Sequence, residues 1–81
     1  MIFVTVMTVE PQENREVYEA IKKIEVPDGV KLVSALGLFG EYDAMLVYEA
    51  PDEKVAMDFL LDLCEIDGVV DTKTFAATKL R

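Results

Sequence analysis

The sequence predicts an α+β domain of four strands and two helices in the order β-α-β-β-α-β. Two amphipathic stretches carry apolar residues at helical spacing, and each ends in an Asp-Gly-Val turn, at Asp28–Val30 and at Asp67–Val69. Runs rich in apolar and β-branched residues precede and follow each stretch. The sequence therefore predicts two consecutive strand–helix units.

The first unit begins with a predicted strand over Ile2–Val9, which Glu10-Pro11 ends. Its apolar residues occupy both faces, a pattern typical of a strand in the middle of a covered sheet. A helix is predicted over residues 12–25, where apolar residues at helical spacing form one stripe. The stripe comprises Val17, Ala20, Ile21 and Ile24. Pro27 cannot continue the helix and Gly29 supplies the turn, so the helix ends before them.

The next two strands are predicted over Val30–Leu38 and Asp43–Ala50. The joint between them, Phe39–Tyr42, is short enough for a hairpin, so we expect the two strands to be antiparallel neighbours.

The second helix is predicted to begin after Pro51-Asp52, with Asp52 as its N-cap. Its expected buried stripe comprises Val55, Ala56, Phe59, Leu60, Leu63 and Ile66. Asp67-Gly68 ends this helix, and a fourth strand is predicted over Val69–Thr78.

With right-handed crossovers, this order predicts a four-stranded antiparallel sheet with both helices on one face. The predicted fold is thus the ferredoxin-like βαββαβ sandwich. Its other sheet face is left open, and strand residues that point there include apolar ones. An open apolar face is a place for a second subunit to pack.

Length and composition also indicate that a second subunit packs on this domain. The 81 residues make one small domain, 1–81. A domain of this size buries only about 60–65% of its unfolded surface, yet 52% of the residues are hydrophobic. We expect the surplus apolar surface to form a homo-oligomer interface. A tightly packed monomer is the alternative.

Charge and targeting signals exclude several classes of function. The net charge is −8 and no basic run occurs, which argues against direct nucleic-acid binding and against an anionic membrane surface. The apolar start has no basic region before it and is too short for a signal peptide or a membrane span. The single cysteine fits a reducing cytoplasm.

The most distinctive motif is the hairpin Gly40-Glu41-Tyr42-Asp43. Glycine can take positive φ there, and Asp43 can hydrogen-bond local amides, so a plain turn is one interpretation. The functional interpretation is a small-molecule site at Gly40, Tyr42 and Asp43. In it, the Asp43 carboxylate holds an ammonium group and free backbone amides hold a carboxylate.

A second candidate pair is Thr72 and Thr74, which lie two residues apart and therefore share one face of the last strand. Strand propensity alone explains two threonines. A ligand role requires their hydroxyls near the hairpin, and in a split βαβ sheet that contact requires another subunit.

Nothing in the chain points to catalysis. There is no histidine, which removes the commonest general base and metal ligand. Cys64 has no Cys or His partner at metal spacing, and we expect it to be a small, partly buried hydrophobic residue. No glycine-rich phosphate loop is present. We therefore predict no enzyme activity, no cofactor and no metal site.

Taken together, these features resemble the ligand-binding and oligomerisation domain of the Lrp/AsnC transcription regulators, the RAM domain. The resemblance rests on the apolar strand before an acidic helix, the Gly29-Val30 strand start, the Gly-x-Tyr-Asp hairpin and the passage Asp67–Thr74. The chain is also similar to the GYD family, which shares the hairpin motif and the stretch Glu49–Glu53.

The Lrp/AsnC resemblance implies a dimeric α+β barrel, in which two sheets pack face to face and dimers assemble into rings. It implies amino-acid effectors bound between dimers, with Gly40, Tyr42, Asp43, Thr72 and Thr74 at the contact positions. Regulators of that family carry an N-terminal helix-turn-helix, whereas this chain begins at its first strand. We therefore expect a stand-alone effector domain that co-assembles with full-length regulators.

Three rivals to this hypothesis stay open. Dimeric α+β barrels also host cofactor-free enzymes, and a polar cavity beneath the helices would favour that function. A purely structural oligomerisation module has no ligand, and a hairpin site filled by its own side chains would favour it. An ACT-type regulatory domain has the same element order but forms a side-by-side dimer.

Overall fold

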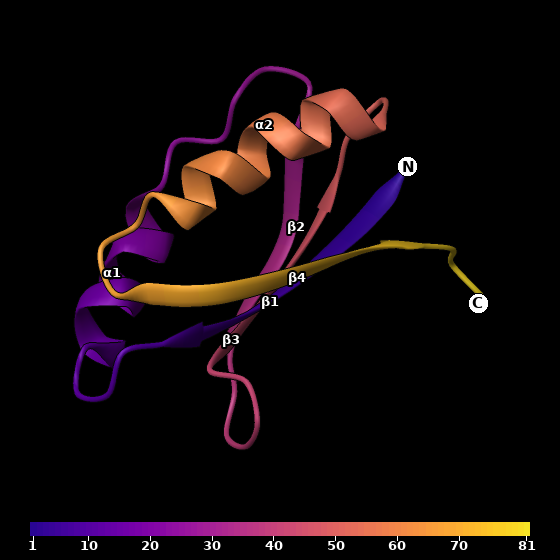
Figure 1. The fold of residues 1–81 in the computed structure, drawn as a ribbon. Helices are drawn as coiled ribbons and strands as arrows, with labels where there is room; N and C mark the ends of the chain where they lie inside the picture. The colour runs from indigo at the N-terminus through magenta and orange to yellow at the C-terminus, as the bar shows by residue number, and fades with distance from the viewer.

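The computed structural model describes residues 1–81 and contains the predicted elements in the predicted order. They are β1 (Ile2–Val9), α1 (Asn14–Lys23), β2 (Lys31–Gly37), β3 (Ala44–Glu49), α2 (Glu53–Cys64) and β4 (Val69–Ala77). The four strands form one antiparallel sheet in the order β2-β3-β1-β4. Figure 1 shows α1 and α2 on the same side of this sheet. The ferredoxin-like α+β fold predicted from the sequence is confirmed.

The core lies between the sheet and the two helices. Alternate residues of β1 point into it, so Phe3, Thr5, Met7 and Val9 are all buried. The Tyr48 ring on β3 packs edge-on against Phe59 of α2, with ring centroids 4.8 Å apart. Other large, fully buried core side chains are Leu46, Leu63 and Val17. Both predicted helix stripes contribute, which explains why the helices lie on one face.

The ends of the elements differ from the expectations in small ways. The first helix begins at Asn14 rather than at Gln12, whose positive φ of 73° is incompatible with a helix. Asp52 is the predicted N-cap of α2, and its carboxylate accepts a hydrogen bond from the Val55 amide at 2.9 Å.

The expectation that Cys64 is partly buried is wrong. The thiol is exposed at the end of α2, one residue past the buried Leu63. Its sulfur lies 3.5 Å from the Thr72 hydroxyl. A one-residue step turns a helix by about 100°, which carries Cys64 off the apolar stripe.

The turn between α2 and β4 depends on Gly68. Its φ is +100°, in the region that favours glycine. A Cβ atom at this position would lie only 2.9 Å from Cγ2 of Val17 on α1. The same turn places the Gly68 carbonyl where it accepts the Glu10 amide at 2.8 Å. Gly68 therefore lets the end of α2 approach both α1 and the end of β1.

The second face of the sheet is not covered by any element of the chain. Strand pairing places one apolar row across three strands, with Val47 beside Val4 and Val4 beside Phe75. The adjacent row contains Leu36, Met45, Val6 and Lys73. Phe75 is 55% exposed and Leu36 is 46% exposed. We call these two rows the open face.

Neither helix has the length and apolar character needed to cross a membrane.

Candidate functional site

The hairpin motif lies at the end of the β2–β3 ribbon. Gly40 has a φ of +134°, and no atom lies within 4 Å of the position that a Cβ would take there. The hairpin closes through the Leu38 amide, which donates to the Asp43 carbonyl at 2.9 Å. The Tyr18 hydroxyl of α1 donates to the same carbonyl at 2.7 Å. The base of the hairpin is thus anchored to α1, while Gly40 at its tip stands in open solvent.

The Asp43 carboxylate is engaged within the chain. Its Oδ2 accepts the Val9 amide at 2.8 Å, and its Oδ1 accepts the Asn14 side-chain amide at 3.3 Å. Asp43 therefore ties the hairpin to the loop between β1 and α1. A ligand ammonium group would have to share these oxygens or displace Asn14.

The Tyr42 side chain reaches across to β4. Its hydroxyl accepts a hydrogen bond from the Lys73 ammonium at 3.3 Å, and this ammonium lies 5.7 Å from the centre of the Tyr42 ring. The hydrogen bond to Tyr42, with smaller contributions from the charges of Asp71 and Glu41, raises the pKa of Lys73 above its ordinary value. The hairpin and β4 thus meet where the Lys73 ammonium contacts the Tyr42 side chain.

Sequence reasoning selected the threonines on either side of Lys73 and missed the lysine itself. Strand alternation could have identified Lys73 as a residue of the uncovered face, because Thr72 and Thr74 share one face of β4 and Lys73 lies on the other. Tyr42 reaches that same open-face side, which only the three-dimensional arrangement reveals.

The two threonines point into the helix-covered side, as their shared face requires. Thr74 hydrogen-bonds Thr5 with an oxygen–oxygen distance of 2.8 Å, and Thr5 bonds the Tyr48 hydroxyl at 2.8 Å. Thr72 lies near the Cys64 thiol. The structure therefore brings Tyr42 and Lys73 together but leaves both threonines on the opposite side of the sheet.

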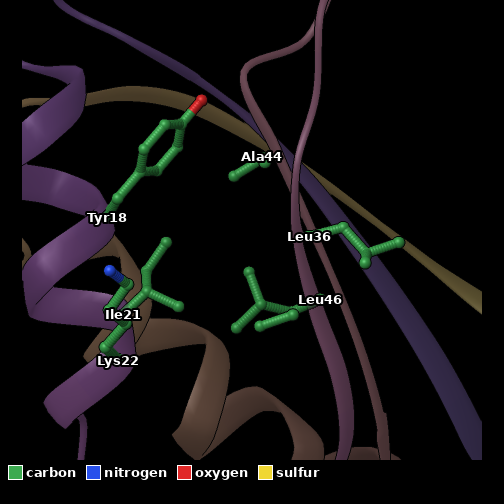
Figure 2. Close-up of a pocket in the computed structure, with 8 residues that line it drawn as sticks. Tyr18, Ile21, Lys22, Leu36, Ala44 and Leu46 are labelled. Carbon is green, nitrogen blue, oxygen red and sulfur yellow. The ribbon is translucent and has the colours of Figure 1, made fainter.

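A pocket of about 220 Å³ lies between α1 and the end of the β2–β3 ribbon, next to the hairpin. Figure 2 shows Tyr18 and Ile21 on α1 facing Ala44 and Leu46 on β3. Six of its eight lining residues are hydrophobic, and the hydroxyl of Tyr18 already donates to the Asp43 carbonyl. No group of three or more metal-ligating side chains occurs in the structure.

Several solved structures share this fold. A Thermus thermophilus protein superposes with a TM-score of 0.79 at 16% identity, covering 99% of this chain and 95% of that one. AsnC of Escherichia coli matches with a TM-score of 0.78 at 10% identity over 96% of this chain. A transcriptional regulator of Neisseria meningitidis, solved as a complex with L-Met, matches with a TM-score of 0.75 at 21% identity over 99% of this chain.

These likenesses, all below 25% identity, agree with the ferredoxin-like α+β fold of the single chain. The chain spans about half of the AsnC and Neisseria proteins, 50% and 51% of their lengths. No curated protein sequence matches it. The sequence model of the GYD domain matches residues 4–80, nearly the whole chain. The protein therefore belongs to the GYD domain family, the second of the two families that its hairpin motif resembles.

Proposed function

We propose that this protein is a non-enzymatic regulatory domain that assembles through its open sheet face and binds a small effector near the hairpin. The observation that carries the proposal is the open face. Val47, Val4 and Phe75 form a continuous apolar row across three strands, and no element of the chain covers it. Contiguous exposed apolar surface usually marks a contact site. A second copy with the same face would bury both sheets, as in a dimeric α+β barrel.

An amino acid is the effector class that the hairpin chemistry favours. Lys73 offers a cation for a carboxylate, and Glu41 and Asp71 offer carboxylates for an ammonium group. Gly40 and Tyr42 belong to the same region, and the Neisseria protein of the same fold was solved with L-Met. In this proposal Asp43 orders the hairpin and contributes to the site. Thr72 and Thr74 would reach a ligand only from a neighbouring copy.

The fold shared with transcription regulators supports a regulatory setting, in which this domain modulates full-length regulators of the Lrp/AsnC type. The mainly apolar lining of the pocket beneath α1 supports a non-enzymatic function, because acid–base or nucleophilic catalysis needs polar groups free to react. The exposed single thiol is consistent with the cytoplasmic location that we include in the proposal.

A second candidate function is a purely structural oligomerisation module without a ligand. The observation that favours it is the Asp43 carboxylate, whose two oxygens are both hydrogen-bonded by the chain itself. The two candidates agree on assembly and differ on the ligand, so two experiments separate them.

Assembly is tested with Phe75→Asp and its matched control Leu61→Asp. The two side chains are almost equally exposed, at 55% and 53%, but only Phe75 lies on the open face, since Leu61 is on α2. Burying an unpaired carboxylate in the interface is expected to cost at least about 2 kcal/mol, or ~30-fold in the dimer dissociation constant. Sedimentation equilibrium measures this constant. Equal effects of the two variants would reject the open face as the interface.

The ligand is tested by a thermal-shift screen against the twenty amino acids. A ligand at a hundred times its dissociation constant adds about 2.7 kcal/mol of stability, which raises the Tm of a domain this small by roughly ten degrees. A shift with one or a few amino acids supports the effector domain. No shift with any of them favours the structural module.

Asp43→Ala then tests the hairpin. We expect this variant to lose the response to that amino acid while the dimer persists. Its stability must be measured alongside, because the variant leaves the Val9 amide without its acceptor. Retention of the full ligand response would exclude Asp43 from the site.

A further inference from the structure

The pocket beneath α1 exists because small residues line the strand side of it. Its lining residues include Ala35 and Gly37 of β2 and Ala44 of β3 on the strand side, and Tyr18 and Ile21 of α1 on the helix side. The Tyr18 ring packs close to Gly37. A Cβ atom added at Gly37 would lie 3.3 Å from Cζ of Tyr18. The hollow is therefore a consequence of side-chain size at the end of the β2–β3 ribbon.

The walls of this pocket are held in place before any ligand arrives. Tyr18 cannot swing freely, because its hydroxyl donates to the Asp43 carbonyl at 2.7 Å. Leu46 and Ala44 are buried on β3, and Ile21 is buried on α1. A rigid apolar hollow binds an apolar group without the cost of ordering its own side chains.

The volume of the pocket is matched by a ligand of about one ring. The pocket measures about 220 Å³, whereas pockets for drug-sized ligands run from about 300 to 1,000 Å³. A dry apolar cavity of ~150 Å³ accepts benzene. A single six-membered aromatic ring therefore suits this space.

Charge at the mouth favours an anion on that ring. Lys22 lines the pocket, and a shallower depression that shares Tyr18 and Lys22 with it adds Arg15. Glu19, which pairs with Lys22 at 3.1 Å, is the one carboxylate of that depression. Two cations and one anion make this part of the surface positive on a protein whose net charge is −8. An anionic group is therefore held more favourably here than over the acidic remainder of the molecule.

We propose that the pocket between α1 and the β2–β3 ribbon binds a small aromatic carboxylate. The ring lies between Tyr18 of α1 and the small residues Ala35 and Gly37 of β2, and the carboxylate lies at the mouth beside Lys22. This site is on the helix-covered side of the sheet, within one chain, whereas Lys73 and the open face are on the other side. It depends on neither the proposed dimer nor an amino-acid effector.

Phenylacetate and its neutral analogue phenylacetamide test the proposal in an amide-resolved NMR titration at low salt. Phenylacetate is expected to bind with a dissociation constant of ~1 mM, a reasonable value for a ligand of ten heavy atoms. The largest shifts are expected at the backbone amides of Ala35, Gly37 and Ala44. Phenylacetamide is expected to bind at the same amides more weakly.

Two variant pairs assign the parts of the site. Ala35→Leu fills the pocket and should weaken both ligands at least about tenfold, whereas Ser34→Leu, on the neighbouring residue that faces the open side beside Val47, should not. Lys22→Gln should weaken phenylacetate about two- to fivefold, the range of an exposed ion pair, and leave phenylacetamide unchanged. Lys23→Gln is its control, because Lys23 does not line the pocket.

Each outcome decides the proposal. No titration by phenylacetate at tens of millimolar overturns it, as does binding that Ala35→Leu leaves intact while the variant's spectrum shows the native fold. Equal loss with Lys22→Gln and Lys23→Gln would overturn the assignment of the carboxylate to Lys22. Sedimentation of the same samples reports the dimer separately, so failure of this site and failure of the assembly proposal are distinguishable.

Discussion

The helix-covered face of the sheet and its open face are built from the same four strands, yet the helices of this chain cover only one of the two faces. Along β1, Phe3 and Met7 are buried beneath the helices, while Val4 and Val6 on the other side are only half-buried. The covered face even accommodates hydroxyl groups, because each one finds a partner there, and no buried side-chain polar atom is left without a hydrogen bond.

The difference shows where the apolar surplus of the composition goes. On a surface that faces water permanently, alternation would place polar residues opposite the core residues. Here the two central strands place Val4, Val6, Met45 and Val47 on the uncovered face, and Lys73 lies on the edge strand beside them. The helix-covered face accounts for folding of the chain, and the open face is suited to assembly. The predictions below test this division of roles.

The largest expected effect contrasts two neighbours on β3. Leu46 is fully buried on the covered face, so Leu46→Ala should lower the free energy of unfolding by about 2–5 kcal/mol. Val47→Ala, on the open face, should cost about 1 kcal/mol or less in a dilute monomer. Urea unfolding at low protein concentration measures both. Similar losses at the two positions would mean that the open face also stabilises the single chain.

Removing hydroxyl groups within the covered face should lower the free energy of unfolding by less than Leu46→Ala does. Thr5→Val leaves the buried Tyr48 hydroxyl without its partner, and we expect a loss of ~1–3 kcal/mol. Thr74→Val removes only the hydrogen bond between Thr74 and Thr5, and Thr5 keeps its hydrogen bond to Tyr48. We therefore expect the free energy of unfolding to fall by ~0.5–1.5 kcal/mol. Thermal unfolding followed by circular dichroism measures both, and the reverse order would contradict the proposed network.

The smallest effect is expected at the open-face edge, where Tyr42 raises the pKa of Lys73. A pKa that is higher in the folded than in the unfolded state stabilises the protein below the unfolded pKa, about 10.4. This stabilisation is lost as pH rises through the folded pKa. Tyr42→Phe should therefore lower the pKa of Lys73, as measured by NMR titration of its side chain. An unchanged pKa would mean that the hydrogen bond is absent in solution.

Local patterns in the sequence predicted the elements closely. The bounds of β1 were those predicted, and Asp52 caps α2 as expected, because strand alternation and helix capping depend on neighbouring residues. The end of α1 and the exposure of Cys64 were less accurate, since these depend on where a helix stops and how it is rotated against the sheet. The hairpin motif itself was recognised, and the family match agrees with it.

The sequence by itself determined the order of the elements, the face that each helix buries and the apolar surplus that leaves one sheet face uncovered. All three follow from periodicity and composition, which are readable without contacts. Only the tertiary structure decided what the functional side chains meet. Asp43 reaches Val9 and Asn14, which are 34 and 29 residues away, and Tyr42 meets Lys73 across 31 residues. Such partners, and the hollow beneath α1, depend on how strands and helices are brought together, and no local pattern specifies that.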